Sequence, residues 1–282
     1  MMKFINKIKH STKVKIFLNK VFKSLHYLND LIFYLLLNFK FYFSSNHKKN
    51  VKKFKLITAA DTSHFKSVCQ LIDTLTTHCV NDEIILYDLG FSNSETDYIK
   101  KNYSNIEIKK FNFSNYPKHV HLEEQDAGAY AWKPIIIHNE LMKNDYPLIW
   151  MDGGNLVQKD LKLIKNYILT RKFYSPYSSD NIKKWTHPTT LSTLDVPKKF
   201  LKKRNLNAAL IGLDVDQKIN NVIENWYKLS LKKQIIIPDG SNKSNHRWDQ
   251  SLLTILFYQE LDYFFKIKTY KLWGVNIHQD ID

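Results

Sequence analysis

The sequence predicts an α/β fold in which helices flank a mostly parallel sheet. Short runs rich in Ile, Leu and Val alternate with longer segments of helical period between residues 54 and 267. In addition, Asp61, Asp88 and Asp152 each fall at or near the end of a predicted strand. Because ligands of parallel sheets bind beyond the carboxyl ends of the strands, these carboxylates are expected to gather at one edge. The other reading is that each Asp only caps a turn or a helix.

The first half of the domain predicts three strands and two helices. FKLITA (54–59) and EIILYDL (83–89) are short apolar runs typical of buried strands, and residues 106–111 form a third. Residues 63–78 place apolar side chains on one helical face, and residues 94–102 follow a Ser/Asn start signal. These elements alternate as a parallel sheet requires.

The second half continues the alternation less regularly. Residues 130–142 carry a helical pattern, and Pro134 fits the first turn of that helix. PLIWM (147–151) is a buried strand that ends at Asp152 and two glycines. Further helices are predicted over 159–168, 216–231 and 248–259, and further strands over 208–213 and 262–267.

Charge divides the chain into an arm and a body. Residues 1–55 carry 13 Lys and one acid, so they hold +12 of the net charge of +15. We assign residues 1–43 to a basic amphipathic arm, 44–53 to a polar linker, and 54–282 to the folded domain. A nearly neutral body argues against a nucleic-acid-binding fold, so no nucleic-acid partner is expected. A second interpretation is that the Lys-rich arm itself binds nucleic acid.

The arm predicts contact with an anionic membrane surface. Apolar residues recur every three or four positions, at Val14, Phe17, Val21, Leu25, Leu28, Ile32 and Leu35. This pattern is typical of a helix lying in a membrane interface. A signal anchor, or a helix packed on its own domain or on a partner, are the alternatives. The ten-residue spacing of Cys69 and Cys79 on one predicted helix is about 15 Å, too long for a disulfide. We therefore expect reduced thiols and a protein at the cytoplasmic face of a membrane.

Five segments together resemble a known family. They read LITAADTSHFKSVCQLIDTL, IILYDLGFS, AYAWKPIIIHNEL, LIWMDGGNLV and NHRWDQSLL. In this order they resemble GT-A-type glycosyltransferases, with a distant similarity to the glycogenin and lipopolysaccharide-galactosyltransferase group. The resemblance spans roughly residues 54–270. It implies a Rossmann-like GT-A domain that takes a nucleotide-sugar donor.

The resemblance also implies a donor site. The first strand and its loop would seat the nucleotide, which maps to Thr58, Ala59 and Asp61. WMDGGN occupies the place of the Asp-x-Asp motif that holds Mn²⁺ or Mg²⁺ against the diphosphate. Asp152 is kept, but the second acid is replaced by Gly154. The metal requirement is therefore open, with Asn155 as a further candidate ligand.

Other residues are assigned to the same site. Gly153 and Gly154 would form a small-residue floor where backbone approaches the donor, unless Asp152 merely ends the strand beside a glycine turn. Lys133 would contact the diphosphate, with Tyr130 and Trp132 stacking on base or sugar. The alternative is that Tyr130 and Trp132 are core aromatics and that Lys133 is a solvated lysine.

The segment NHRWDQS completes the predicted site. Asp249 and Gln250 would lie near the transferred sugar, and His246 or Arg247 would face phosphate. Asp249 near a helix start fits a capping role equally well. His278 is a candidate for the late metal-binding histidine of related enzymes.

These residues predict a glycosyltransferase of the hexosyltransferase type. It would act on a glycan or lipid-linked acceptor, as in polysaccharide or lipopolysaccharide biosynthesis. The incomplete Asp-x-Asp motif leaves a non-catalytic nucleotide- or sugar-binding relative as the alternative. A metal-dependent phosphoesterase using Asp61, Asp88 and Asp152 is a third reading, although such sites normally gather more ligands around two metals.

Overall fold

A computed structural model describes residues 53–143, 146–261 and 273–282, with nine further positions between Val21 and Phe39. At its centre lies a six-stranded sheet in the order β3-β2-β1-β4-β9-β6. Strands β1 to β4 are mutually parallel where they pair, and β9 is antiparallel to both β4 and β6. The predicted α/β fold with a mostly parallel sheet is confirmed.

The elements have the following bounds. The strands are β1 Lys55–Asp61, β2 Glu83–Gly90, β3 Ile106–Lys110, β4 Leu148–Met151, β5 Leu156–Val157, β6 Phe173–Tyr174, β7 Tyr177–Asn181, β8 Arg204–Leu206, β9 Leu210–Leu213 and β10 Val275–Asn276. The helices are α3 Phe65–His78, α4 Asn93–Asn102, α5 Gln125–Ala129, α6 Trp132–Met142, α7 Lys162–Arg171, α8 Ile182–Trp185, α9 Pro188–Thr193, α10 Gln217–Ser230, α11 Lys233–Ile236 and α12 Trp248–Glu260.

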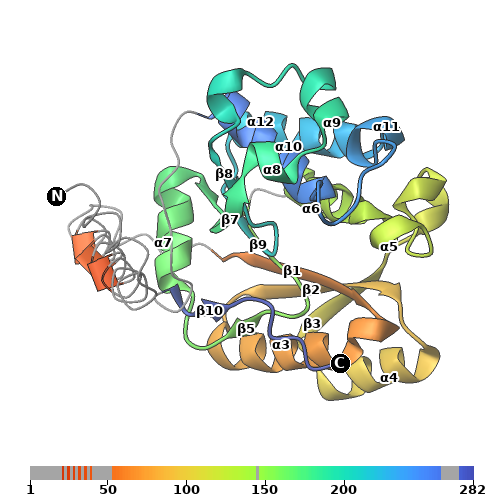
Figure 1. Cartoon of the computed structure of the whole chain (residues 1–282). Coiled ribbons are helices and arrows are strands. Elements are labelled where there is room, and N and C mark those ends of the chain that lie inside the picture. Colours follow the sequence, from red (N-terminus) through yellow and green to blue (C-terminus); the bar gives the residue numbers. More distant parts are fainter. Residues whose placement is uncertain are drawn as a thin grey trace, which may run out of the picture.

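Helices cover both faces of the sheet (Figure 1). Helices α3 and α4 pack on one face, where Val68, Ile72 and Ile99 meet the strand residues Ala60 and Leu86. Helices α6, α10 and α12 cover the other face around the largest apolar cluster of the described chain. Burial on both faces explains why β1 and β4 read as continuous apolar runs instead of alternating ones.

Local sequence signals account for several element ends. Ser92 caps α4, and its side chain and that of Glu95 form a capping box. Asp216 caps α10 by accepting a hydrogen bond from the backbone N–H of Lys218. Pro134 lies in the first turn of α6, where a missing backbone donor costs nothing.

Some sequence expectations differ from the structure. Residues 172–207 contain β6, β7, α8, α9 and β8, none of which was predicted. The helix predicted from residue 159 begins at Lys162, because Asp160 accepts a hydrogen bond from the Lys162 backbone N–H and ends the preceding turn. The strand predicted over 262–267 lies outside the described residues.

Most of the N-terminal arm also lies outside the described residues. The nine positions that are described there are helical, and Val21, Leu25, Leu28, Ile32 and Leu35 are exposed. In the part of the chain that the structure describes, we find no helix with the length and apolar character needed to cross a bilayer. The two cysteines are free thiols, as predicted.

Candidate active site

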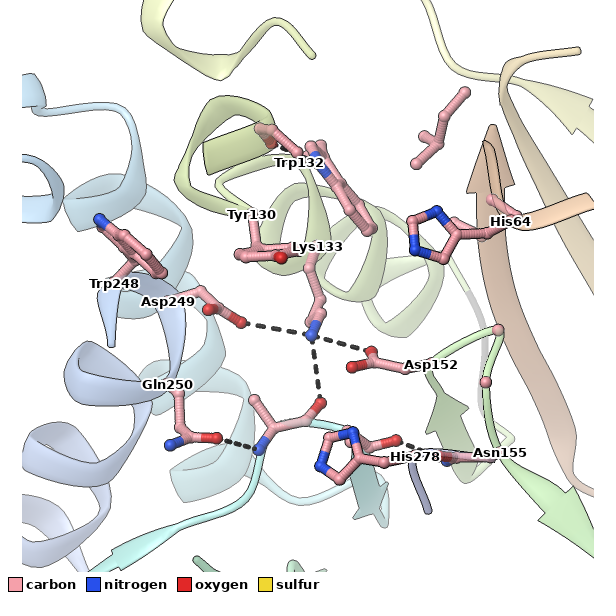
Figure 2. Close-up of a pocket in the computed structure, with 18 of the residues that line it drawn as sticks. His64, Tyr130, Trp132, Lys133, Asp152, Asn155, Trp248, Asp249, Gln250 and His278 are labelled. Atoms are coloured by element: carbon pink, nitrogen blue, oxygen red, sulfur yellow. Dashed lines mark hydrogen bonds and ion pairs between the residues drawn. The ribbon is translucent and has the colours of Figure 1, made fainter. Parts of the chain in front are cut away.

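A cavity of about 430 Å³ opens at the carboxyl ends of β1 and β4. This volume falls within the range of ligand pockets, about 300–1,000 Å³. Its walls come from the end of β1, the loop after β4, the start of α6, the segment before β9, the start of α12 and the C-terminal segment (Figure 2). Many of the sequence-predicted residues therefore meet in one place.

Lys133 lies at the centre of this cavity. Its side chain projects from the first turn of α6 and is 4% exposed. The ammonium Nζ lies 2.8 Å from Oδ1 of Asp152 and 3.4 Å from Oδ2 of Asp249, and it donates to the backbone oxygen of Ala208 at 3.3 Å. Burial opposes the charged form, but the two carboxylates outweigh it, so the pKa of Lys133 is raised. The lysine is a fixed cation held inside the protein.

Asp249 is the buried partner of this lysine. It is 4% exposed in the first turn of α12, and burial raises the pKa of its carboxyl to about 6 despite the nearby Lys133. The N-cap position of α12 is Arg247, and the Asp249 side chain does not cap the helix. Oδ2 faces the lysine at ion-pair distance but accepts no hydrogen bond within the described chain. The Asp249 side chain therefore does not cap α12, and the capping alternative is wrong.

Asp152 is the more exposed partner. Its side chain is 36% exposed, and Oδ1 also accepts a hydrogen bond from the indole nitrogen of Trp150 at 2.7 Å. The carboxylate thus bridges the buried lysine and the open part of the cavity. These contacts are made by the side chain, so Asp152 does more than end a strand.

The loop after Asp152 is held by Asn155. The Asn155 side-chain amide donates to the backbone oxygen of Ala209 at 2.7 Å, and the residue is fully buried. Its Oδ1 accepts no hydrogen bond from the described residues, although Asn155 lines the cavity. A buried oxygen without a donor is costly, so a ligand at this position would stabilise it.

The two glycines of the loop behave differently. A Cβ placed on Gly153 would meet Val68 and Ala59 at 3.6 and 3.7 Å, which are ordinary contacts. A Cβ on Gly154 would lie 2.1 Å from Oδ1 of Asp280. Both glycines line the cavity, so the small-residue floor stays a prediction, and at Gly154 the close neighbour is a carboxylate of this chain.

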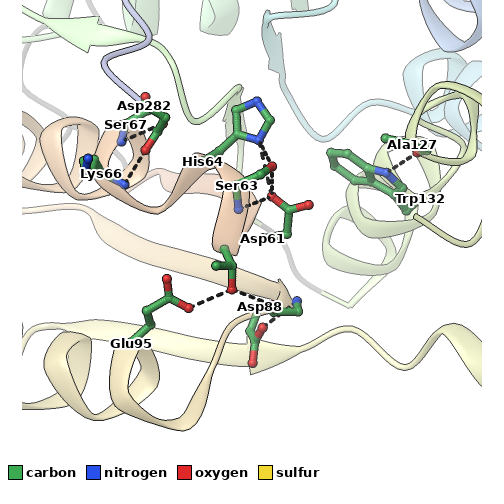
Figure 3. A network of polar contacts seen from close by, with 12 residues as sticks. Asp61, Ser63, His64, Lys66, Ser67, Asp88, Glu95, Ala127, Trp132 and Asp282 are labelled. Carbon is green, nitrogen blue, oxygen red and sulfur yellow. Dashed lines mark hydrogen bonds and ion pairs between the residues drawn. The ribbon is translucent and has the colours of Figure 1, made fainter. Parts of the chain in front are cut away.

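The end of β1 supplies Ala59, Ala60 and Asp61 to the cavity wall. Thr58 is fully buried within the strand and is not among the lining residues. Asp61 accepts hydrogen bonds from the Ser63 backbone and hydroxyl and lies 3.3 Å from Nδ1 of His64 (Figure 3). Burial alone would raise the pKa of the Asp61 carboxyl, but these contacts lower it.

Asp88 lies at the end of β2 but is not part of the cavity lining. Its Oδ1 accepts hydrogen bonds from the backbone N–H groups of Gly90 and Phe91. Of the three strand-end acids, Asp61 and Asp152 thus reach the pocket and Asp88 caps a turn. A phosphoesterase site built on all three is not assembled.

Aromatic and basic side chains complete the wall. Tyr130 and Trp132 both line the cavity, with ring centroids 6.0 Å apart. Gln250 fixes the segment before β9, because its Oε1 accepts a hydrogen bond from the Ala208 backbone at 3.2 Å. Arg247 also lines the cavity, and its guanidinium lies 4.2 Å from the ring centroid of Trp185.

His246 does not face phosphate, in contrast to one sequence expectation. It is fully buried, and its Nδ1 accepts a hydrogen bond from the His187 backbone while Nε2 lies 3.1 Å from the Ile236 carbonyl. Burial lowers the pKa of its imidazole to about 4. His246 therefore has a structural role.

A left-handed turn borders the cavity and was not predicted. Asp126, Ala127, Gly128, Ala129 and Tyr130 all have φ between 50° and 65°. For residues other than glycine this conformation costs roughly 1–2 kcal/mol each. Strain of this kind is concentrated at functional sites, and here it brings Ala127 and Tyr130 to the pocket.

The donor set fits a divalent cation that is shared with a substrate's phosphates. Asp152, Asn155, His278 and Asp280 all line the same cavity, and they offer carboxylate, amide and imidazole ligands. Within the described ranges no three His, Cys, Asp or Glu side chains form a ready-made metal site. Mg²⁺ is commonly held by only one or two carboxylates plus substrate phosphates, so such a site needs the substrate to be complete.

Sequence comparisons give a partial match to a family of undefined activity. The model of a family described as "Protein of unknown function (DUF1647)" matches residues 10–138, less than half of the chain. A search of curated protein sequences gave no match. Sequence similarity therefore does not name an activity.

Structure comparisons identify the fold. The apo structure of the WbbM bifunctional glycosyltransferase matches with a TM-score of 0.51 and 14% identity, over 76% of this chain and 39% of that protein. The structure of galactosyltransferase LgtC with donor and acceptor sugar analogues matches with a TM-score of 0.45 and 15% identity, over 72% of this chain and 70% of that protein. Mouse xyloside xylosyltransferase 1 matches with a TM-score of 0.47 and 9% identity, over 76% of this chain and 85% of that protein. The fold assignment rests on the first of these: the chain has the fold of the GT-A glycosyltransferases.

Proposed function

We propose that this protein is a glycosyltransferase that moves a sugar from a nucleotide-sugar donor to a glycan or lipid-linked acceptor. The observation that carries the proposal is the buried ion pair of Lys133 with Asp152 and Asp249 in the cavity. A charged lysine and the carboxylate of Asp249 are expensive to bury. Their position at the carboxyl ends of parallel strands, where α/β folds bind ligands, supports a functional reason for that cost.

The cavity residues have distinct proposed roles. The end of β1, with Ala59 and Asp61, would receive the nucleotide. Asp249 would accept hydrogen bonds from the transferred sugar, because its Oδ2 is buried and accepts no hydrogen bond within the described chain. Lys133 would hold that carboxylate in its ionised form and face the diphosphate. Gln250 would fix the neighbouring backbone, and Arg247 would approach phosphate with its guanidinium.

A divalent cation is part of the proposal. Asp152, assisted by Asn155 and His278, would hold Mn²⁺ or Mg²⁺ at the open side of the cavity. When bound, the ion would neutralise the charge that develops on the leaving diphosphate. The residues of the chain orient the donor around it.

The arm suggests where the acceptor is located. Residues 1–43 are rich in Lys and include exposed apolar side chains such as Leu25, Ile32 and Leu35. Such a segment suits an anionic membrane surface. We propose that the enzyme works at the cytoplasmic face of a membrane on a membrane-associated acceptor.

A donor-turnover assay tests the proposal. The full chain is incubated with Mn²⁺, membrane extract and a panel of uridine, guanosine, cytidine and adenosine nucleotide-sugars, and nucleoside diphosphate release is measured. Sustained release from one donor class is expected. Nucleotide binding without turnover would favour the non-catalytic alternative, and neither binding nor turnover would refute both.

A further inference from the structure

We propose that Asp280 supplies the second carboxylate of the cation site, in place of the acid missing at Gly154. The inference rests on the proposed function and deepens it. It assigns a ligand role to a residue that lies 126 positions after the broken motif. The acid would be moved from the loop to the C-terminal segment without changing the chemistry of the site.

The spatial relation of the two residues carries this inference. A Cβ built on Gly154 would lie 2.1 Å from Oδ1, 2.5 Å from Cγ and 2.6 Å from Oδ2 of Asp280. The whole Asp280 carboxylate therefore occupies the space into which a side chain at position 154 would project. A side chain at position 154 would therefore have to displace the Asp280 carboxylate, whereas glycine leaves that carboxylate in place.

The C-terminal segment is held on both sides of Asp280. Before it, β10 pairs with β5, and the backbone N–H of Gln279 donates to the Gly154 oxygen at 2.6 Å. After it, Ile281 donates from its backbone to the Ser67 hydroxyl at 2.9 Å. The Asp282 carboxylate then accepts hydrogen bonds from the backbone of Lys66 and Ser67 at 2.9 and 3.2 Å, at the start of α3 (Figure 3). The backbone on both sides of Asp280 is thus held in place.

The charges around Asp280 favour a cation. Four acids line the cavity, Asp61, Asp152, Asp249 and Asp280, against three permanently charged bases, Lys133, Lys243 and Arg247. Lys133 is already shared by Asp152 and Asp249. Within the described residues, no Lys, Arg or His forms an ion pair with Asp280. A diphosphate would meet a net negative wall unless a further cation entered.

A second observation points to a ligand at the same place. Asn155, one residue after Gly154, is fully buried and lines the cavity, yet its Oδ1 has no hydrogen-bond donor in the described chain. An amide oxygen of this kind is a normal ligand for hard divalent cations. The loop after β4 thus provides oxygen atoms from Asp152 and Asn155, and the C-terminal segment provides those of Asp280. The phosphates of a donor would complete the coordination.

Mn²⁺ binding to the full chain tests the inference directly. Free Mn²⁺ is followed by electron paramagnetic resonance, with the chain alone and with each of UDP, GDP, CDP and ADP. Asp280→Asn keeps the shape of the side chain and removes its charge. Asp239→Asn is the matched control, because Asp239 is exposed and lies outside the cavity lining. Circular dichroism melts check that all variants are folded.

A relocation variant makes the test specific. Asp280→Gly removes the acid and opens the space, and Gly154→Asp added to it returns an acid from the loop side. Asp280→Asn and Asp280→Gly are expected to weaken Mn²⁺ binding at least about tenfold, since losing even an outer-shell partner costs 10–100-fold. The double variant is expected to recover most of that loss. Gly154→Asp alone should not gain affinity, because its side chain would displace the Asp280 carboxylate from the space that it occupies.

The outcomes separate this inference from the proposed function. If wild type binds Mn²⁺ and nucleotide but Asp280→Asn matches wild type, Asp280 is not a ligand and the proposed function stands. If nucleotide binds equally well with chelator and no Mn²⁺ is taken up, the cation site is refuted while the donor site survives. If no nucleotide binds, both proposals are refuted.

Discussion

Nζ of Lys133 lies 2.8 Å from Oδ1 of Asp152, and this contact joins the first turn of α6 to the loop after β4. A second contact, to Oδ2 of Asp249, joins both to α12. Two consecutive elements, α6 and the loop after β4, are therefore held together with the distant α12 by one buried cation. We therefore expect the stability of the domain to depend on that cation.

Replacing Lys133 is expected to destabilise the protein. Lys133→Met keeps most of the apolar stem but leaves Asp249 buried without its cation. Removing one member of a buried ion pair costs about 3–5 kcal/mol, so the free energy of unfolding should fall by that amount in urea titrations. Adding Asp249→Asn should recover part of the loss. Equal stability of Lys133→Met and wild type would show that the pair is solvated and not buried.

His246 is expected to make stability sensitive to acid. Its folded pKa of about 4 lies below the ordinary value of 6.5, so the unfolded chain binds the proton more readily. The contribution is fully present above about pH 6.5 and is lost as pH falls towards 4, at up to about 1.4 kcal/mol per pH unit.

The comparison of wild type with His246→Asn isolates this contribution. Urea unfolding between pH 7 and 4.5 should show a shallower pH dependence in the variant, because Asn can still accept from the His187 backbone but does not titrate. Parallel curves for the two proteins would mean that His246 is not buried in its neutral form.

The left-handed turn beside the cavity is expected to require glycine at position 128. Gly128 has φ +65°, and a Cβ there would lie 2.2 Å from the Val120 carbonyl oxygen. Gly128→Ala should therefore lower the unfolding free energy by more than about 1 kcal/mol. Gly240→Ala is a useful control, because φ is also positive (+81°) but the nearest atom to its Cβ would be 3.9 Å away. Equal losses of unfolding free energy in the two variants would mean that the positive φ alone sets the cost, and not the contact of the Cβ with the Val120 carbonyl oxygen.

The sequence was informative wherever a local pattern was enough. Ile219, Val222, Ile223 and Trp226 of α10 follow helical spacing and are all buried in the structure. Strand ends placed Asp61 and Asp152 at one edge because parallel topology fixes which ends meet. The same rule also suggested Asp88 for a site, but the N–H groups of Gly90 and Phe91 use its carboxylate to cap a turn.

Other features depend on contacts that no local pattern contains. The left-handed turn was not predictable, since Ala127, Ala129 and Tyr130 in it are of types that rarely adopt positive φ. The proximity of Asp280 to Gly154 arises from the pairing of β10 with β5, two-residue strands with little sequence signal. Either His246 or Arg247 was expected to face phosphate, and the chain turns His246 into the core while Arg247 lines the cavity.

The most direct test of the central claim compares donor turnover by wild type, Asp249→Asn and Asp239→Asn. The account predicts that Asp249→Asn lowers nucleoside diphosphate release about 10²–10³-fold, as for loss of one electrostatic contact to the reacting group, while nucleotide binding and the Asp239→Asn control remain close to wild type. Turnover by Asp249→Asn at the wild-type rate would contradict the account, because the sugar would then react elsewhere than in this cavity.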